Sequence, residues 1–380
     1  MKLKKFFSLA ATAALSISVL AGCGGDSSTS EVSFRLAHNQ PENHPIHESL
    51  TSFAEADKAG VKVEVFPNGT LGTEREVIEL VQTGALDMAK VSAAALESFN
   101  EDFAILSLPY VFESQEHYYN VMDNSKSIQT IYENSKEVGF VPITWYDSGQ
   151  RSIYTVDKKV ESPADMKGLK IRVQESQTSI AMIEAMGGSP TPMSYGEVYT
   201  GLQQGLIDGA ENNETALTTG KHGEVAKAYT YTEHQYSPDI LIVSTKAWDK
   251  LADEQKDALV KAAKESTESH KTIWAEAVKE SVKEAEALGV KFYTIDKTPY
   301  IEAASVLHEE FTKKGDTEKQ YFDELLKVHD QRLQYLDGLN NLVKNKVTKG
   351  DIISAKAHDF YSFMALNPDI NTAYAIFKEA

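Results

Sequence analysis

The 380-residue sequence contains a single cysteine, Cys23. A disulfide framework and a metal site built from cysteine pairs are therefore excluded, and so is a cysteine nucleophile if Cys23 is modified. Long apolar runs are equally scarce, because no segment after residue 20 approaches the roughly 20 residues that a membrane-spanning helix needs. Basic residues number 38 against 56 acidic ones, which gives a formal net charge of −18. Such an acidic chain repels nucleic acid and anionic lipid, so neither is expected as a partner.

The one apolar run lies at the N-terminus. A lysine-rich start precedes residues 6–20, which end in Leu20-Ala21-Gly22-Cys23. A basic start, a short apolar run and small residues before a cut are typical of a bacterial export signal, and the small residues followed by cysteine resemble a lipobox. We therefore predict that residues 1–22 are a lipoprotein signal peptide and that Cys23 becomes lipidated. An ordinary signal peptide with an incidental cysteine is the alternative.

The mature chain is then expected at a membrane in the periplasm or on the outer cell surface. Loss of Lys2, Lys4 and Lys5 with the signal peptide would move its formal charge from −18 to −21. Residues 23–30 are rich in Gly, Ser, Thr and Asp and predict a flexible tether.

Beyond the tether, strand and helix patterns alternate, which favours α/β layers with ligand sites at strand ends. The predicted strands are 32–37, 61–66, 86–91 and 169–173, with an extended crossing at 190–192. The predicted helices are 44–59, 73–83, 177–186, 195–204 and 248–288, and Ser162-Pro163-Ala164-Asp165 predicts a further helix start. The run 248–288 is about 60 Å long as a helix, more than one domain is wide, so it is expected to bend or to brace two lobes.

Several separated stretches carry a family pattern. They are Ser148-Gly-Gln-Arg151, residues 165–173, and the segment from Gly188 through Tyr195 to Asn212, together with 66–72, 84–88 and 108–110. In order and spacing, this pattern resembles the substrate-binding proteins of TRAP transporters, the DctP type, over about residues 32–330. The resemblance implies an α/β fold with two lobes, a periplasmic-binding-protein-like clamp with hinge strands. The implied first lobe is 31–149 with 238–277 and the second 150–237 with 278–330, which leaves 331–380 as a C-terminal extension of unknown role.

The same resemblance implies a binding protein rather than an enzyme. It would capture a small organic carboxylate without a cofactor and deliver it to a membrane permease driven by an ion gradient. Arg172 falls at the position of the family's carboxylate-clamping arginine. Other ligand contacts of the family fall at Arg151, Asn212, Asn39, Glu74 and Ser92, and His38 and Lys90 lie beside mapped positions. Tyr195 is a candidate wall of the pocket, and a monomer is expected.

Residue chemistry supports the assignment of Arg172 independently. A planar guanidinium presents paired donors that match the two oxygens of a carboxylate. Arg172 lies in the apolar strand Ile171-Arg172-Val173, and a buried arginine needs an anionic partner. An internal ion pair with Glu211 or Asp208 would satisfy that need as well. For Arg151 the alternative is a solvated turn residue.

The remaining candidate site residues could also have ordinary structural roles. Asn39 and Asn212 can both donate and accept, which suits ligand hydroxyls, yet asparagine is common in turns. Glu74 could be no more than a favourable charge at a helix N-terminus, and Tyr195 could belong to the core. If Glu74 does face the ligand, it would oppose a second carboxylate, so we favour a sugar acid such as a uronate over a C4-dicarboxylate. Arg151 or Lys90 would provide the second cationic end if the ligand were a dicarboxylate.

Other functions are less well supported. A metal-binding lipoprotein could use His38, His44 and His47, although Pro45 interrupts them and no His-rich loop is present. The GxSxG, HExxH and SxxK patterns of exported hydrolases are absent. A ligand sensor built on the same clamp stays open.

Overall fold

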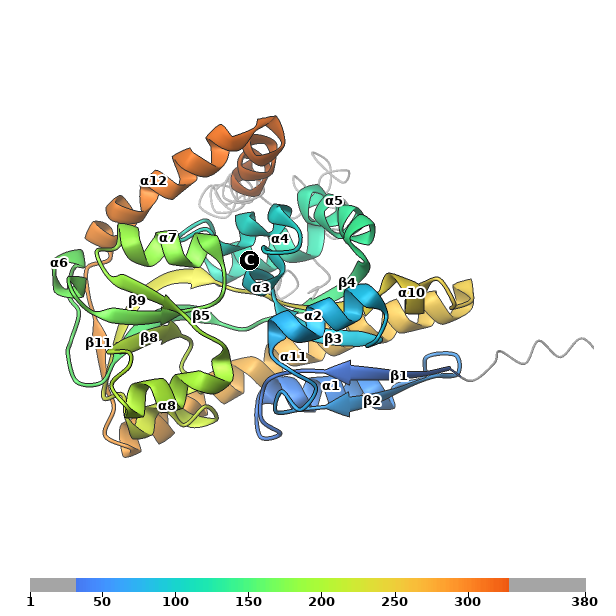
Figure 1. Ribbon diagram of the computed structural model, residues 1–380, viewed down its shortest axis with the longest axis horizontal. Helices are drawn as coiled ribbons and strands as arrows, with labels where there is room; N and C mark the ends of the chain where they lie inside the picture. Colours follow the sequence, from blue (N-terminus) through green and yellow to red (C-terminus); the bar gives the residue numbers. More distant parts are fainter. Residues whose placement is uncertain (1–31, 328–380) are drawn as a thin grey trace, which may run out of the picture.

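The computed structural model describes residues 32–327 (Figure 1), which form two β-sheets surrounded by helices. The predicted signal peptide, Cys23, the tether and the extension 331–380 lie outside the described residues. The fold class is confirmed as α/β with two lobes. The strands are β1 (Val32–Ala37), β2 (Val61–Phe66), β3 (Met88–Ser92), β4 (Phe140–Tyr146), β5 (Gln150–Thr155), β6 (Lys170–Val173), β7 (Ser189–Pro192), β8 (Gly209–Asn212), β9 (Ala228–Tyr236), β10 (Asp239–Ser244) and β11 (Lys291–Thr294).

The first lobe contains a five-stranded sheet in the order β2-β1-β3-β10-β4. β1 is parallel to both β2 and β3, whereas β10 is antiparallel to its neighbours β3 and β4. The second lobe contains a six-stranded sheet in the order β11-β9-β5-β8-β6-β7. In that sheet β6 is parallel to β7 and β8, and β5 is antiparallel to β8 and β9.

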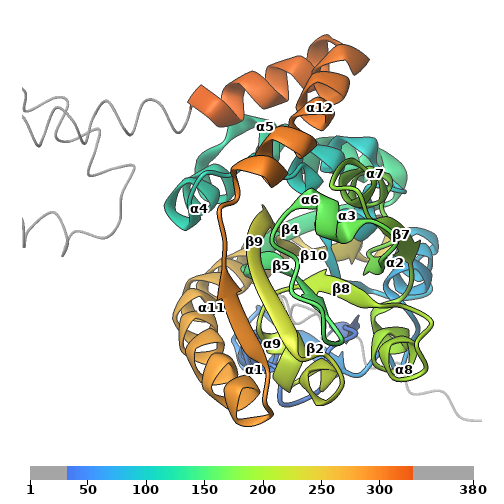
Figure 2. The same cartoon turned by 90° about the vertical axis from the view of Figure 1, so that its left-hand side faces the viewer.

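The helices cover both sheets. They are α1 (Pro45–Glu55), α2 (Glu74–Thr83), α3 (Ala93–Leu96), α4 (Gln115–Asn124), α5 (Lys126–Asn134), α6 (Pro163–Met166), α7 (Gln177–Ala185), α8 (Val198–Gln203), α9 (Thr215–Thr218), α10 (Thr245–Trp248), α11 (Asp253–Ala287) and α12 (Thr298–Lys314). Short 3₁₀-helices occur at η1 (Glu101–Ser107), η2 (Ser135–Val138), η3 (Tyr195–Glu197) and η4 (His222–Glu224). In Figure 2, α12 lies over α7 of the second lobe, and the two helices are in contact.

Two predicted helices end earlier or begin later than the sequence pattern suggested. The helix expected to reach residue 59 stops at Glu55, because Ala56 adopts an extended conformation. The buried Lys58 ammonium then donates to the freed carbonyls of Phe53 and Ala54 at 2.9 and 2.8 Å. The helix expected from 248 begins at Asp253 after an extended Ala252, and its 35 residues correspond to about 52 Å.

The chain passes between the lobes at two adjacent places. β4 leads to β5 through residues 147–149, and β9 leads to β10 through Ser237 and Pro238. Tyr146 pairs with Asp239 on one side of the crossing, and Gln150 pairs with Tyr236 on the other. The two connections therefore lie side by side as a pair of hinge strands. The lobe boundaries stated above stay a prediction.

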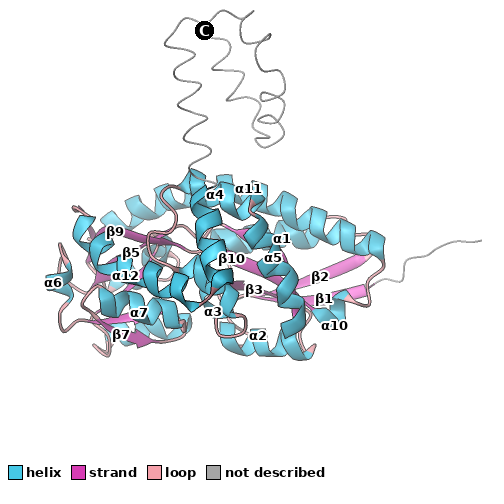
Figure 3. Ribbon diagram, turned by 90° about the horizontal axis from the view of Figure 1, so that it is seen from above, coloured by secondary structure: helices cyan, strands magenta, loops and turns pink. Residues whose placement is uncertain are grey.

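Helix α11 is a third link. It packs against α1 and β4 of the first lobe and α9 of the second, and Figure 3 shows it running along most of the length of the molecule. His270 on α11 contacts the backbone oxygen of Asp147 in the first crossing at 2.8 Å. The Asp147 carboxylate accepts hydrogen bonds from the Tyr119 hydroxyl at 2.5 Å and from Gly149 N at 2.8 Å. The crossing is thus fixed by α11 on one side and α4 on the other.

Candidate functional site

Two cavities of about 150 and 30 Å³ lie between the two lobes and share five lining residues, and we call the larger one the outer part and the smaller one the inner part of the cavity. Asn39 and Glu74 from the first lobe line both parts, as do Arg172, Gln174 and Tyr195 from the second. A side chain from each lobe therefore faces any occupant, as a clamp requires.

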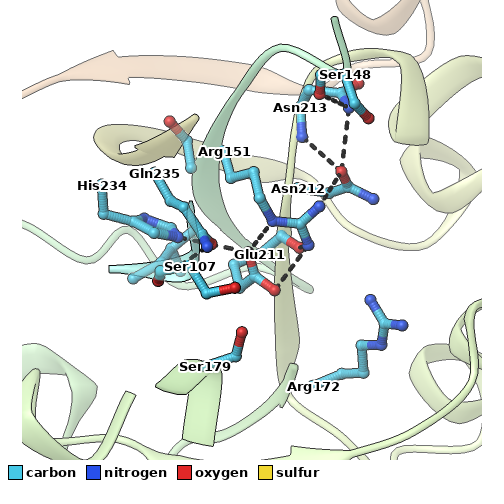
Figure 4. A network of polar contacts seen from close by, with 12 residues as sticks. Ser107, Ser148, Arg151, Arg172, Ser179, Glu211, Asn212, Asn213, His234 and Gln235 are labelled. Carbon is cyan, nitrogen blue, oxygen red and sulfur yellow. Dashed lines mark hydrogen bonds and ion pairs between the residues drawn. The ribbon is translucent and has the colours of Figure 1, made fainter. Parts of the chain in front are cut away.

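Arg172 is a cationic side chain at this cavity that has no anionic partner among residues 32–327. It lies in β6 between β7 and β8 and is 4% exposed. Its Nε donates to Met193 O at 2.9 Å, and no residue in 32–327 accepts a hydrogen bond from Nη1 or Nη2. In Figure 4 its guanidinium stands apart from the neighbouring polar network. Desolvation lowers the pKa of Arg172, while the nearby Glu211 raises it and Arg151 lowers it further.

The internal ion pair considered for Arg172 is not formed. Asp208 accepts a hydrogen bond from the Lys170 backbone at 2.8 Å. Glu211 pairs with Arg151 instead, in a fork visible in Figure 4. The pairing arises because β8 lies beside β5, with Ser152 opposite Asn212 and Ile153 opposite Glu211.

Arg151 is a fully engaged, buried cation, so the alternative of a solvated turn residue is wrong. It is 3% exposed, and its Nε contacts Glu211 Oε2 while Nη2 donates to Oε1 at 2.7 Å. Nη2 also donates to Glu211 O at 2.6 Å, and Nη1 donates to Asn212 Oδ1 at 2.9 Å. Burial raises the pKa of Glu211, but Arg151 and a hydrogen bond with His234 outweigh it and hold that pKa at about 2.

The amide of Asn212 has an orientation fixed by its partners. Its Oδ1 accepts from Arg151 Nη1 and from the backbone N of Asn213, both at 2.9 Å. Both partners can only donate, so the oxygen must point toward them. The NH₂ group of Asn212 is left as a donor at the inner part of the cavity, which Asn212 lines.

Glu74 faces the cavity from the N-terminus of α2. The helix starts in a capping box between Thr73 and Glu76, so Glu74 is not needed as a cap. Its carboxylate accepts from Ser92 N and Ser92 Oγ, both at 2.9 Å. Burial raises the pKa of Glu74, partly offset by Lys90. Ser92 thereby orients Glu74, and both residues line the inner part of the cavity.

Lys90 is a second cation that is already paired. Its Nζ is 2.8 Å from Asp239 Oδ2 and 3.4 Å from Asn39 Oδ1, and Lys90 is 1% exposed. Asp239 is the first residue of β10, directly after the second lobe crossing. The lysine therefore ties β3 to the hinge and holds the amide of Asn39 at the cavity.

His38 does not line either part of the cavity. Its Nε2 lies 3.1 Å from Nδ1 of His47, and its Nδ1 accepts from Gln40 N at 3.3 Å. Desolvation, reinforced by Lys90 and His47, lowers the pKa of His38 to about 3. The third histidine of the metal hypothesis, His44, caps α1 by accepting from Ile46 N at 3.2 Å. Among residues 32–327 no group of three His, Cys, Asp or Glu side chains is placed to hold a metal ion.

Tyr195 forms a wall of the cavity, and a Cβ at Gly220 would collide with its hydroxyl. Burial raises the pKa of Tyr195 to about 12, partly offset by Arg172 and Arg151, so it stays neutral. Sequence reasoning missed Gln174 and His44 as lining residues. Gln174 could have been found, because it follows Arg172 by two residues and alternate residues of an extended chain share a face.

Comparison with known proteins gives the same picture. The family model for bacterial extracellular solute-binding protein, family 7 (DctP) matches residues 36–314. An uncharacterized protein, YiiZ, from Salmonella typhimurium is 41% identical over 288 residues, which is 75% of this chain and 88% of that protein. None of the helices within residues 32–327 is long and apolar enough to cross a membrane.

Two solved structures are similar throughout their length. A TRAP periplasmic solute-binding protein from Anaerococcus prevotii, with bound α/β-D-glucuronate, is 40% identical with a TM-score of 0.77 and covers 79% of this chain and 99% of its own. One from Bradyrhizobium, in complex with α/β-D-galacturonate, is 38% identical with a TM-score of 0.74 and covers 77% and 99%. The resemblance noted in the sequence is thereby confirmed, and the chain belongs to the DctP family of extracellular solute-binding proteins that serve TRAP transporters.

Proposed function

We propose that this protein captures a hexuronate, such as D-glucuronate or D-galacturonate, and delivers it to a TRAP permease. The observation that carries the proposal is the unpaired guanidinium of Arg172 in the cavity between the lobes. Its Nη1 and Nη2 would bind the two oxygens of one ligand carboxylate as a fork. The Asn212 NH₂ group and the carboxyl of Glu74 would meet ligand hydroxyls.

The charge pairing favours a monocarboxylate over a dicarboxylate. Arg151 and Lys90, the two groups that could hold a second carboxylate, are already neutralised by Glu211 and Asp239. Breaking a buried ion pair by redirecting one partner leaves the other charge uncompensated, which is strongly unfavourable. A second carboxylate would also lie near Glu74, which is acidic. The glucuronate and galacturonate bound to the two similar structures support the same ligand class.

Calorimetric titration of Arg172→Ala tests the role of the arginine. Hydrogen bonds to charged groups contribute about 1.5–3 kcal/mol each, so uronate affinity should fall at least tenfold. Arg75→Ala is a matched control, because this arginine lies exposed on α2 with a side chain that is 55% accessible. Unchanged affinity in a folded Arg172→Ala protein contradicts the assignment. Binding of succinate by the wild-type protein, with no binding of any uronate, contradicts the ligand class.

The lipobox-like sequence Leu20-Ala21-Gly22-Cys23 supports a lipid anchor at Cys23, and we also expect the protein to be a monomer. Cys23→Ser should release the protein from the membrane fraction or block its maturation, because the thiol that carries the lipid is gone. Mass spectrometry of the native mature protein checks this directly, and an unmodified residue 23 refutes the anchor. Light scattering of the purified protein with ligand checks the monomer, and a stable dimer would contradict it.

A further inference from the structure

Two glutamine side chains in the cavity have carbonyl oxygens without partners. Oε1 of Gln40 and Oε1 of Gln174 are both buried, and neither accepts a hydrogen bond from any residue in the described range 32–327. Gln40 belongs to the first lobe and follows β1, whereas Gln174 belongs to the second lobe and follows β6. Both line the inner part of the cavity, and Gln174 lines the outer part too.

The backbone of Gln174 is fixed beside Arg172, the arginine proposed to bind the carboxylate. It is 8% exposed, and its backbone oxygen accepts from Ser176 N at 2.8 Å in the turn that leads into α7. Because side chains two residues apart on an extended chain point to the same side, Gln174 and Arg172 face the same occupant. Gln40 is fixed in a comparable way, since its backbone N donates to His38 and its backbone O accepts from Asn68 N at 2.9 Å.

A buried carbonyl without a donor destabilises the ligand-free protein, and structures retain few such groups. Both side chains line the cavity, so an occupant of the cavity is placed to supply the missing donor. A carboxylate can only accept, so the group that binds Arg172 cannot also satisfy these two carbonyl oxygens. Ligand hydroxyls can. An acid without hydroxyls would leave both oxygens unpaired on binding, and a site built for hydroxyls rejects analogues that lack them.

We propose that Gln174, together with Gln40 from the opposite lobe, accepts hydrogen bonds from ligand hydroxyls and sets the selectivity of this site for polyhydroxylated acids. Arg172 binds the carboxylate of any acid that enters, and the two glutamines decide which acids are held. This selectivity mechanism rests on the proposed function and assigns the recognition of hydroxyls to particular atoms.

Gln174→Met tests this mechanism, because methionine has a similar size and no polar group. Uronate affinity, measured by calorimetry, should fall roughly tenfold or more. Affinity for cyclohexanecarboxylate, a six-membered ring acid without hydroxyls, should not fall, so the ratio of the two affinities should collapse. The melting temperature of the ligand-free variant should rise, because the unpaired carbonyl has been removed. A merely structural glutamine would instead give a lower melting temperature.

Gln40→Met provides an independent variant from the other lobe, with the same expected directions. Gln129→Met is the matched control, because Gln129 is exposed on α5 away from the cavity. Unchanged uronate affinity in both cavity variants overturns the mechanism, and so does a lowered ligand-free melting temperature in both. If uronate binding is lost in Arg172→Ala but kept in Gln174→Met and Gln40→Met, the proposed function stands and this inference alone fails. If the wild-type protein binds no uronate, the proposed function fails and the inference fails with it.

Discussion

Replacing Glu211 by glutamine should both destabilise the protein and change which acids it binds. Glu211 is fully buried and neutralises Arg151, whose guanidinium donates to both carboxylate oxygens. Glutamine keeps the shape of the side chain but removes the charge, so Glu211→Gln leaves a buried arginine without an anion. His234 on β9 also loses the carboxylate oxygen that lies 3.4 Å from its Nε2.

The size of the effect follows from the pKa of Glu211, which is lowered in the folded protein from 4.5 to about 2. At about 1.36 kcal/mol per pKa unit, this difference corresponds to about 3 kcal/mol of stability at neutral pH. Loss of one partner of a buried ion pair typically costs about 3–5 kcal/mol, which agrees. We therefore expect urea unfolding at pH 7 to show a loss of about 3 kcal/mol, with a melting temperature lower by roughly 4–5 °C for a chain of this size.

The sign of the pH dependence gives a second check. A carboxyl with a lowered folded pKa stabilises the protein above its unfolded pKa, and this stabilisation disappears as the pH falls through the folded pKa. The difference between wild type and Glu211→Gln should thus be complete above about pH 5 and should shrink between 4.5 and about 2. Glu265→Gln is the control, because Glu265 is an exposed residue of α11 whose contact with Lys261 is 3.9 Å long. A loss below about 1 kcal/mol in Glu211→Gln would show that the buried arginine tolerates the missing charge, and the reasoning would be wrong.

Ligand binding by Glu211→Gln tests whether the effect of this substitution comes from charge or from packing. Arg151 lines the inner part of the cavity, so without Glu211 it becomes a second unpaired cation there. Succinate should then gain affinity relative to D-glucuronate, in contrast to the wild type. The double variant Arg151→Met/Glu211→Met should recover much of the stability without this gain, because an apolar pair replaces the ion pair. An unchanged ratio of succinate to glucuronate affinity in Glu211→Gln would contradict the charge argument for a monocarboxylate.

Three further changes test other parts of the site. Gly149→Ala should lower stability by about 1–3 kcal/mol in urea unfolding and weaken uronate binding, because Gly149 has φ +72° and a Cβ would lie 3.0 Å from both Asn213 and Trp274. Wild-type stability and wild-type uronate affinity in this variant would show that the crossing at residues 147–149 has room for a side chain. The free energy of unfolding should fall by about 2 kcal/mol between pH 7 and 5 through His38 alone, because its folded pKa is lowered from 6.5 to about 3 and only the unfolded chain takes up the proton. His38→Asn should reduce this dependence of stability on pH, and an equal dependence in both proteins would refute the assignment. Lys90→Met should destabilise the protein by leaving Asp239 unpaired, yet uronate affinity should fall less than in Arg172→Ala; an equal loss, measured by calorimetry, would make Lys90 a direct ligand contact.

Local signals in the sequence were sufficient for many elements. The Ser162-Pro163 helix start is present as α6, with the Ser162 backbone N donating to Asp165 at 3.0 Å. Strand β2 matches its alternating pattern residue for residue. Such features depend on neighbours a few positions away, so they can be read from a short stretch of chain. The lost last turn of α1 could not be read in this way, because it depends on where the Lys58 ammonium finds carbonyl partners.

The candidate site shows the same limit of prediction from local sequence more clearly. Arg172 occurs in an apolar strand and Arg151 follows a Ser-Gly-Gln turn, and sequence alone allowed an internal ion pair for Arg172. The choice is made by strand register. Arg172 is opposite Ala210, so Glu211 points to the other face of the sheet, whereas Ile153 is opposite Glu211 and Arg151 lies two residues from Ile153 on that face. Strand register depends on residues far apart in the chain, so no local pattern contains it. The pattern similar to the DctP family pointed to Arg172, the arginine without an anionic partner among residues 32–327, because it carries that long-range information indirectly.

At the cavity, the buried groups that have partners can be distinguished from those that lack them. Arg151 and Lys90 have buried anionic partners, and they connect strands next to the crossing between the lobes. Arg172, Gln40 and Gln174 carry polar atoms without partners among residues 32–327, and all three face one cavity. Unsatisfied buried groups raise the free energy of the ligand-free protein. A ligand that satisfies them is bound more tightly for that reason, and it satisfies groups of both lobes at once. On the proposed function, the same atoms that limit the stability of the empty protein would therefore favour closure of the lobes around a hydroxylated carboxylate.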